Sequence, residues 1–395
     1  MSNAQWDTTA DLRTLSDCFR NIRDPRVVGR SEHALYDILA IILVATIAGC
    51  DNFVAMADYA RKREPWFRER MGLKLLGGIP SHDTLMRTMS ILNPTEFQKG
   101  FALFVQVMLK RIPELHDKQI AIDGKAMRGS SHEDLDAVKR MVHMVGAWST
   151  EAGLALGQIP TDEKSNEIPA IPKLLELLDI SGALVSIDAM GCQKEIAAKI
   201  VGNDGDYLLQ VKGNQPHLYE DIQHLTELLE EEDFVDFDQH EDDPGRKEHG
   251  RLEYRRTIVI DDQELLRESI RDYDLWKGLK SVVVTKSLRE LDGKVSEETR
   301  YHICSRAAWA AVLGKSVRGH WGIENGLHWI LDVAFGEDDH RLYGGHAAAN
   351  LATIRRMALP LLKKPKVKLG IANRRLKASY DNEFLEEVIA DFLEN

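Results

Sequence analysis

Two apolar segments of the sequence each end in an aspartate. "IAID" ends at Asp123 and "VSID" ends at Asp188, and small residues follow both. A carboxylate at the end of a buried strand is held rigidly near the sheet edge where α/β folds bind ligands. Two such carboxylates repel each other unless a cation lies between them, and carboxylate oxygens suit Mg²⁺ or Mn²⁺. Either aspartate alone could simply begin a turn, but the matched pair favours a metal site.

A third candidate carboxylate lies in "HWGIENGLHWILDVAFGEDDH", His320 to His340. Read as a helix, this segment has an apolar stripe, and Glu324 lies at its border. A carboxylate at that border needs a partner, and a metal ion is one. Histidines and acids also recur here at steps of four: His320, Glu324, His328 and Asp332. A self-contained zinc site is the weaker alternative, because the HExxH pattern requires Glu directly after the first His, where Trp321 stands.

The segments that position these carboxylates predict an α/β fold. "KQIAIDGKAM", "VKRMVHMVGAWS" and "LALGQIP" read as three strands, and "GALVSIDAMG" and "DYLLQVKGN" as buried strands with helices before and between them. Three strands followed by alternating helix and strand indicate a mixed sheet flanked by helices.

The composition changes along the chain and predicts four parts. Residues 1–115 form a helical N-terminal domain, and residues 116–214 the first part of the α/β core. Residues 215–305 form an acidic and β-rich insertion, whose segment Glu227–Asp243 is interpreted as a solvated or mobile excursion. Residues 306–395 supply helices that complete the core and carry a basic region, Arg355–Lys377.

Bulk properties exclude several classes of protein. The four cysteines are dispersed, which argues against a zinc ribbon or a disulfide scaffold and fits a reducing cytosol. The most apolar run, Ile38–Cys50, is shorter than the roughly 20 residues of a spanning helix, so we expect no membrane segment. A net charge of −12 does not indicate a nucleic-acid partner. A nucleic-acid partner is still compatible with the sequence, because nucleic-acid binding depends on local basic surfaces. Basic clusters occur between Arg61 and Arg87 and in Arg355–Lys377.

Five motifs in order resemble the insertion-sequence transposases of the H-repeat-associated (ISAs-type) family. They are "AIDGKAMRGS", "DEKSNEIPAIPKLLELLDISGALVSIDAMGCQKEIA", "YLLQVKGNQ", "HGRLEYR" and "RGHWGIENGLHWILDVAFGEDDHR". The resemblance runs from about residue 10 to about residue 380. The family belongs to the DDE superfamily, so it implies an RNase H-like core interrupted by a β-rich insertion and preceded by a helical domain. It also implies a bacterial protein of the cytoplasm and nucleoid.

The same resemblance implies an activity, metal-dependent nicking of DNA at element ends and strand transfer. Asp123, Asp188 and Glu324 would hold two Mg²⁺ or Mn²⁺ ions, with Asp123 bridging both. The partners would be double-stranded DNA and, in the active complex, a second copy of the chain. Two alternatives are a catalytically silent DNA-binding remnant and a nuclease on the same core that does not transpose.

The residues that contact DNA are less sharply predicted. Related transposases place Tyr, Arg and Lys around the Glu, where this chain has Val317, His320 and Leu331. Arg251 and Arg255 share a strand face with Glu253, so they would either follow a DNA backbone or form a cross-strand ion-pair ladder. Asp332 stays open as a substitute third ligand. The candidate DNA contacts are Lys212, Arg251, Arg255, Arg318, His320, His328, Arg355 and Arg356.

Overall fold

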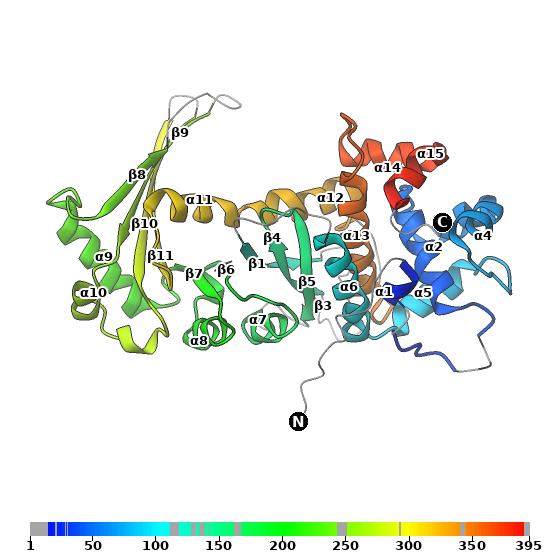
Figure 1. Ribbon diagram of the computed structural model, residues 1–395, viewed down its shortest axis with the longest axis horizontal. Coiled ribbons are helices and arrows are strands. Elements are labelled where there is room, and N and C mark those ends of the chain that lie inside the picture. Colours follow the sequence, from blue (N-terminus) through cyan, green and yellow to red (C-terminus); the bar gives the residue numbers. More distant parts are fainter. Residues whose placement is uncertain are drawn as a thin grey trace.

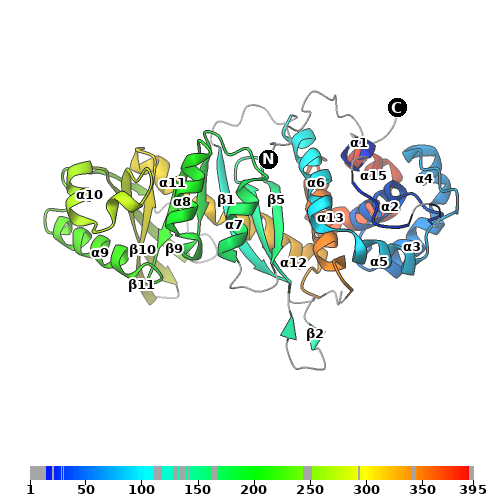
Figure 2. The ribbon, with the colours of Figure 1, turned by 90° about the horizontal axis from the view of Figure 1, so that it is seen from below.

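The structure is a computed structural model in which three parts lie along the longest axis (Figure 1). A helical part occupies one end, a sheet with helices on both faces lies in the centre, and a β-rich part occupies the other end (Figure 2). The structure describes residues 15–19, 22–27, 29, 31–110, 118–127, 132–133, 139–140, 142–161, 167–242, 251–291, 294–339 and 344–390. Within these ranges, no helix has both the length and the apolar character needed to cross a membrane.

The centre of the sheet combines antiparallel and parallel strands. These are β1 (Gln119–Ala126), β4 (His143–Ser149), β5 (Leu154–Thr161), β6 (Leu184–Ile187) and β7 (Asp206–Val211). β1, β4 and β5 are antiparallel neighbours, and β1, β6 and β7 are parallel neighbours. Helices α7 (Glu167–Leu175) and α8 (Lys194–Gly202) pack against β4, β5 and β7. The predicted RNase H-like order, three strands followed by alternating helix and strand, is confirmed. A separate strand pair, β2 (His132–Glu133) and β3 (Lys139–Arg140), lies outside this sheet.

The inserted segment extends this sheet. It contains α9 (Pro216–Glu230), β8 (Asp238–Asp242), β9 (Arg251–Ile260), α10 (Gln263–Ser269), the 3₁₀ turn η4 (Tyr273–Leu275), β10 (Ser281–Leu291) and β11 (Lys294–Cys304). The resulting sheet has nine strands in the order β5-β4-β1-β6-β7-β11-β10-β9-β8. In its described part the acidic segment is largely exposed, as expected, but it has regular structure, because it includes the end of α9 and the edge strand β8. Asp238 and Asp242 of β8 accept hydrogen bonds from the Ala310 N–H and from Arg318, which hold the charged strand in place.

One long helical segment crosses the other face of the sheet. It consists of α11 (Ala310–His320), a π-helical turn η5 (Glu324–His328) and α12 (Trp329–Phe335). α11 contacts strands from β8 and β9 to β6 and β1, so the sheet curves around it. Glycines allow the close approach: a Cβ at Gly314 would lie 2.6 Å from Thr257 Oγ1, and one at Gly319 would overlap Oε1 of Gln119.

The predicted N-terminal helices are present. They are α1 (Leu15–Phe19), α2 (Leu35–Ile47), α3 (Phe53–Lys62), α4 (Glu64–Met71), α5 (His82–Ile91) and α6 (Pro94–Leu109). The charged segment Phe53–Met71 forms two helices, α3 and α4, which meet at Arg63, two residues before Pro65. Pro65 has no N–H to donate, so it suits the first turn of a new helix rather than the middle of one.

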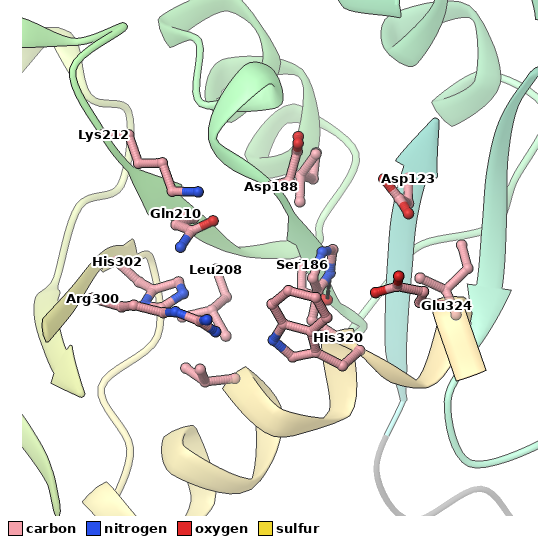
Figure 3. Close-up of a pocket in the computed structure, with 14 residues that line it drawn as sticks. Asp123, Ser186, Asp188, Leu208, Gln210, Lys212, Arg300, His302, His320 and Glu324 are labelled. Carbon is pink, nitrogen blue, oxygen red and sulfur yellow. Dashed lines mark hydrogen bonds between the residues drawn. The ribbon is translucent and has the colours of Figure 1, made fainter. Parts of the chain in front are cut away.

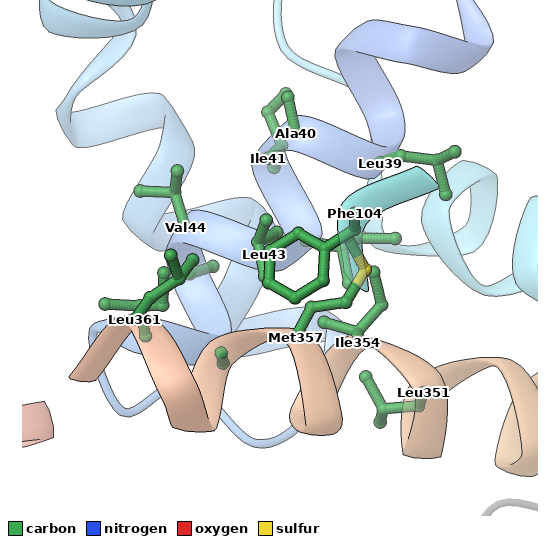
Figure 4. Close-up of a cluster of buried hydrophobic side chains, with 14 of the residues drawn as sticks. Leu39, Ala40, Ile41, Leu43, Val44, Phe104, Leu351, Ile354, Met357 and Leu361 are labelled. Atoms are coloured by element: carbon green, nitrogen blue, oxygen red, sulfur yellow. The ribbon is translucent and has the colours of Figure 1, made fainter. Parts of the chain in front are cut away.

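The last helices belong with the N-terminal ones. α13 (Ala347–Lys363), α14 (Ile371–Tyr380) and α15 (Asn382–Ile389) follow the crossing helix. α13 packs on α2, α5 and α6, and α14 packs on α2. Figure 4 shows apolar side chains of α2, such as Leu43, meeting Phe104 of α6 and Met357 of α13. Among the described helices of residues 306–395, α11, η5 and α12 cross the sheet as expected, whereas α13 touches it at β5 and packs mainly with the N-terminal helices.

Gly319→Ala is expected to destabilise the protein, because its Cβ would overlap Gln119, which two hydrogen bonds to Ser186 and Ser316 hold in place. Overpacking of this kind costs roughly 1–3 kcal/mol. Gly322→Ala is the matched control on the same helical segment, since its Cβ would meet Thr150 at 3.6 Å, an ordinary contact. Thermal unfolding of both variants checks this, and equal melting temperatures would contradict the close packing.

Candidate active site

The parallel pairing of β1 and β6 brings Asp123 and Asp188 together. Ile122 and Ile187 are the last partners in this pairing, so each aspartate is the next residue on its strand. Adjacent strands lie about 4.8 Å apart. Asp123 is not at the strand end as predicted, because β1 continues to Ala126 alongside β4.

Main-chain N–H groups orient both carboxylates. Asp123 Oδ1 accepts a hydrogen bond from the Gly124 N–H at 2.8 Å. Asp188 Oδ1 accepts bonds from the N–H groups of Met190 and Gly191 at 3.2 and 3.4 Å. Asp188 therefore caps a turn, as expected if this aspartate simply begins a turn. In both carboxylates Oδ1 accepts the main-chain bonds, which leaves Oδ2 for other partners.

Asp123 is in an environment that disfavours its charged form. Burial raises the pKa of Asp123 to about 7, the charge of Asp188 adds to the shift, and Glu167 and Glu324 contribute further repulsion. The Gly124 N–H acts in the opposite direction. Acids from three separate segments thus act on one carboxyl group, and a bound cation would relieve their repulsion.

The π-helical turn η5 lies within the series His320, Glu324, His328 and Asp332, which recurs every four residues along the sheet. Four residues overshoot a regular α-helical turn by ~40°. They fall short of the wider π turn, whose hydrogen bonds join residues five apart, as the bond from the Trp329 N–H to the Glu324 carbonyl does. The excess rotation in the α-helical turns and the shortfall in the π turn oppose each other, so all four side chains face the strands. His320 Nδ1 lies 3.1 Å from Ser186 Oγ, and Asp332 accepts from Lys125 Nζ at 2.5 Å.

His328 contacts Asp123 rather than solvent. Its Nδ1 lies 3.5 Å from Asp123 Oδ2, and burial, together with Arg356 and Lys125, lowers the pKa of His328 to about 3. The imidazole is therefore neutral and 8% exposed. It is not a DNA-contacting group as predicted; it is a neighbour of the carboxylate.

One pocket of about 280 Å³ collects the three predicted acids. Asp123, Asp188 and Glu324 lie toward one side of it, and Ser186 and His320 lie between them and the opposite wall (Figure 3). Asp332 does not line this pocket and is paired with Lys125, so it is not a substitute for Glu324.

Of the other predicted DNA contacts, some line the pocket and some are paired with acids outside it. Lys212 and His320 line the pocket. Arg318 is exposed on α11 and paired with Asp242. Arg255 is paired with Glu253 at 2.5 Å, and Glu253 also accepts from Arg289 across the strands at 3.4 Å, which is the ion-pair ladder of the alternative interpretation. The side chain of Arg251 lies outside the described residues.

Arg355 and Arg356 are buried, which corrects their assignment as DNA contacts. They are 1% and 2% exposed, and both guanidinium groups lie near Glu337 Oε1, at 3.7 and 3.3 Å. Lys125 Nζ lies 4.0 Å from Glu337 on its other side. The basic run in the sequence therefore includes a buried charge network that joins β1 to α13.

Two residues near the site were not predicted as part of it. Glu167 opens α7 with its carboxyl against Gly124, where an added Cβ would lie within 2.5 to 2.6 Å of its atoms. Arg300 of β11 lines the pocket although it lies in the insertion. Nothing in the sequence pattern links either residue to Asp123, since both approach it only through the fold.

Comparison with known proteins places this geometry in a family. A model described as "Transposase DDE domain" matches residues 115–361, and one described as "DDE_Tnp_1-associated" matches residues 16–105. The chain belongs to the DDE transposase family. The match covers both the sheet that carries the acids and the helical part before it.

Two relatives of this DDE family member, both over most of their length, agree with this assignment. The chain is 38% identical over 385 residues to "Putative transposase YncI" of Escherichia coli O157:H7, covering 96% of this chain and 95% of that one. It is 36% identical over 388 residues to "H repeat-associated putative transposase YhhI" of Escherichia coli K12, covering 96% and 98%. A piggyBac transposase synaptic complex with hairpin DNA aligns with 98% of this chain and 86% of its own, at 11% identity and a TM-score of 0.43.

The acids of this DDE chain fit divalent cations by their chemistry. Carboxylate oxygens are the donors that Mg²⁺ and Mn²⁺ prefer, and the pKa of Asp123 is raised by burial and by the charge of the neighbouring acids. In the part of the chain that the structure describes, no three His, Cys, Asp or Glu side chains are close enough to form a ligand group. The three acids share a pocket without converging on a point.

Asp123→Asn is expected to stabilise the metal-free protein, and increasingly so as the pH rises from about 4 to about 7. The pKa of Asp123 is about 7 in the folded chain against an ordinary value of 3.8. Between these values unfolding releases a proton, so the wild type loses stability with rising pH, whereas asparagine does not titrate. Above pH 7 the gain is constant.

Melting temperatures in EDTA across this pH range check the expectation. Asp236→Asn is the control, because Asp236 is exposed and does not line the pocket. A pH-independent difference between Asp123→Asn and the wild type would contradict the raised pKa.

Arg356→Gln is expected to lower stability strongly, because it leaves Glu337 buried with a weakened charge network. Breaking a buried pair costs about 3–5 kcal/mol. Lys368→Gln, an exposed change in the same basic region, is expected to leave the melting temperature unchanged. A stable Arg356→Gln protein with a reduced salt dependence of DNA binding would instead restore the DNA-contact assignment.

Proposed function

We propose that this chain is an active insertion-sequence transposase, which nicks DNA at element ends and transfers the freed 3′-OH to target DNA. The observation that supports this most is the shared pocket of Asp123, Asp188 and Glu324, built from two neighbouring strands and the crossing helix. These three residues would hold two Mg²⁺ or Mn²⁺ ions. When bound, such a pair of ions supplies activation of the attacking oxygen and charge stabilisation of the leaving oxygen.

The residues of the chain itself supply orientation and charge. The Gly124, Met190 and Gly191 N–H groups fix one oxygen of each aspartate. Asp123 must be ionised to act as a ligand, and because its pKa is raised to about 7, protons compete with cations below that pH. We therefore expect activity to rise with pH through the neutral range.

The substrate in this proposal is double-stranded DNA, namely element ends and target, bound by a homodimer of the chain. The helical part and the exposed lysines of the basic region, such as Lys366 and Lys368, would hold the ends. Binding through such residues weakens steeply with added salt.

Incubation of the purified protein with labelled DNA from the flanks of its gene, target plasmid and Mn²⁺ tests the proposal. We expect nicked ends and joined products. Asp188→Asn and Glu324→Gln should each lower both by at least about 100-fold, because each removes a ligand worth several kcal/mol of charge stabilisation. Asp236→Asn should retain full activity, because that carboxylate is outside the pocket.

The same assay separates the alternatives. Nicks without joined products indicate a nuclease. Binding without cleavage, unchanged by Asp188→Asn, indicates a catalytically silent DNA-binding protein and contradicts the proposal.

A further inference from the structure

The wall of the pocket opposite the acids is made of basic and polar side chains. Gln210 lies near the end of β7 and Lys212 directly follows that strand, and Arg300 and His302 come from β11 (Figure 3). Burial lowers the pKa of His302 to about 3, so this imidazole is neutral. The positive charge of the wall therefore comes from Lys212 and Arg300.

These two cations lie on neighbouring strands. β7 and β11 pair antiparallel with His302 opposite Gln210 and Tyr301 opposite Val211. Continuing this register by one residue puts Arg300 opposite Lys212. Residues two apart on a strand share a face, so Arg300 lies on the face of His302, and Lys212 on that of Gln210, toward the pocket.

Arg300 is held in place but is accessible. Its Nε and Nη2 donate to the two oxygens of Glu298 at 2.8 and 2.9 Å. Its guanidinium group lies 5.1 Å from the centre of the Trp321 ring, a cation–π contact. Its side chain is 19% exposed and that of Glu298 is 44% exposed.

Glu298 lies in a strongly positive environment. The hydrogen bonds from Arg300 lower its pKa most, and Arg289 and Lys212 lower it further. A carboxylate bound to both arms of a guanidinium group has the same donor arrangement as a phosphate bound there. Glu298 therefore occupies donors that a phosphate could use.

We propose that Arg300 and Lys212 form a binding site for one phosphate of the DNA backbone beside the acids, and that Glu298 occupies Arg300 until DNA displaces it. The inserted segment would then supply half of the substrate site through β11. This inference rests on the proposed function, because it assigns the phosphate to the DNA that the acids would cleave. Trp321 keeps the guanidinium group over the pocket while its partner changes.

The two members of the ion pair should have opposite effects on DNA binding. Anisotropy of a fluorescent duplex is measured in EDTA between about 50 and 200 mM salt, so that no cleavage occurs. Arg300→Gln should weaken binding roughly sixfold to tenfold near 0.1 M salt and reduce the slope of log K against log salt by about 0.9. Glu298→Gln should tighten binding about twofold to fivefold, because it removes the competing carboxylate.

Control variants separate this site from general effects. Arg271 is also an ion-paired arginine of the insertion, bound to Asp221 and Glu220, but it is outside the pocket, so Arg271→Gln should bind like the wild type. Arg300→Lys should keep the salt slope, since it keeps the charge. Arg300→Gln with wild-type slope, or weaker binding by both Arg300→Gln and Glu298→Gln, would overturn the proposal.

Because the assay contains no metal ion, its result is independent of catalysis. If the wild type nicks DNA with Mn²⁺ while Arg300→Gln binds normally, the phosphate site is wrong and the proposed function stands. If the wild type binds through Arg300 but never nicks, the phosphate site stands and the proposed activity fails.

Discussion

The close packing of α11, η5 and α12 across the sheet is the constraint on which the rest of the structure depends. Gly314 approaches β9 and Gly319 approaches β1, and at Gly326 a Cβ would lie 2.9 Å from the Trp148 ring on β4. With side chains at these positions the helix would stand farther from the strands, and Glu324 would leave the neighbourhood of Asp123. Small residues with no reacting group of their own therefore set the geometry of the acids.

This packing works against electrostatic repulsion. Asp123, Asp188, Glu167 and Glu324 come from separate segments, and burial together with the repulsion from the other three acids raises the pKa of Asp123. The buried network of Lys125, Glu337, Arg355 and Arg356 lies behind them and places positive charge next to β1. Hydrophobic burial along α11 and in the helical part supplies the free energy that holds like charges together in the absence of metal.

Much of the fold, and the meeting of the three acids in one pocket, could be predicted from the sequence, because apolar periodicity and aspartates that follow apolar runs are local signals. The π turn could not, since its wider winding is favoured by packing on the sheet rather than by the residues Glu324–His328 themselves. The prediction that Arg355 and Arg356 contact DNA was wrong, because it used only their place in a basic run. Their burial depends on α2, β1 and Glu337, which the run does not reveal. Arg300 has no local signal, because only the pairing of β11 with β7 brings it to the pocket.

The chain leaves the central strands after β7 and returns to them on β11, the neighbour of β7. The inserted segment thus begins and ends at the same place, and the elements between its ends lie beyond one edge of the central strands. Residues added or lost there, for example in the α9–β8 connection, would change the distance in sequence between Asp188 and Glu324 without changing their distance in space. In chains built this way, sequence spacing between the second and third acids is a poor guide to whether the acids can work together.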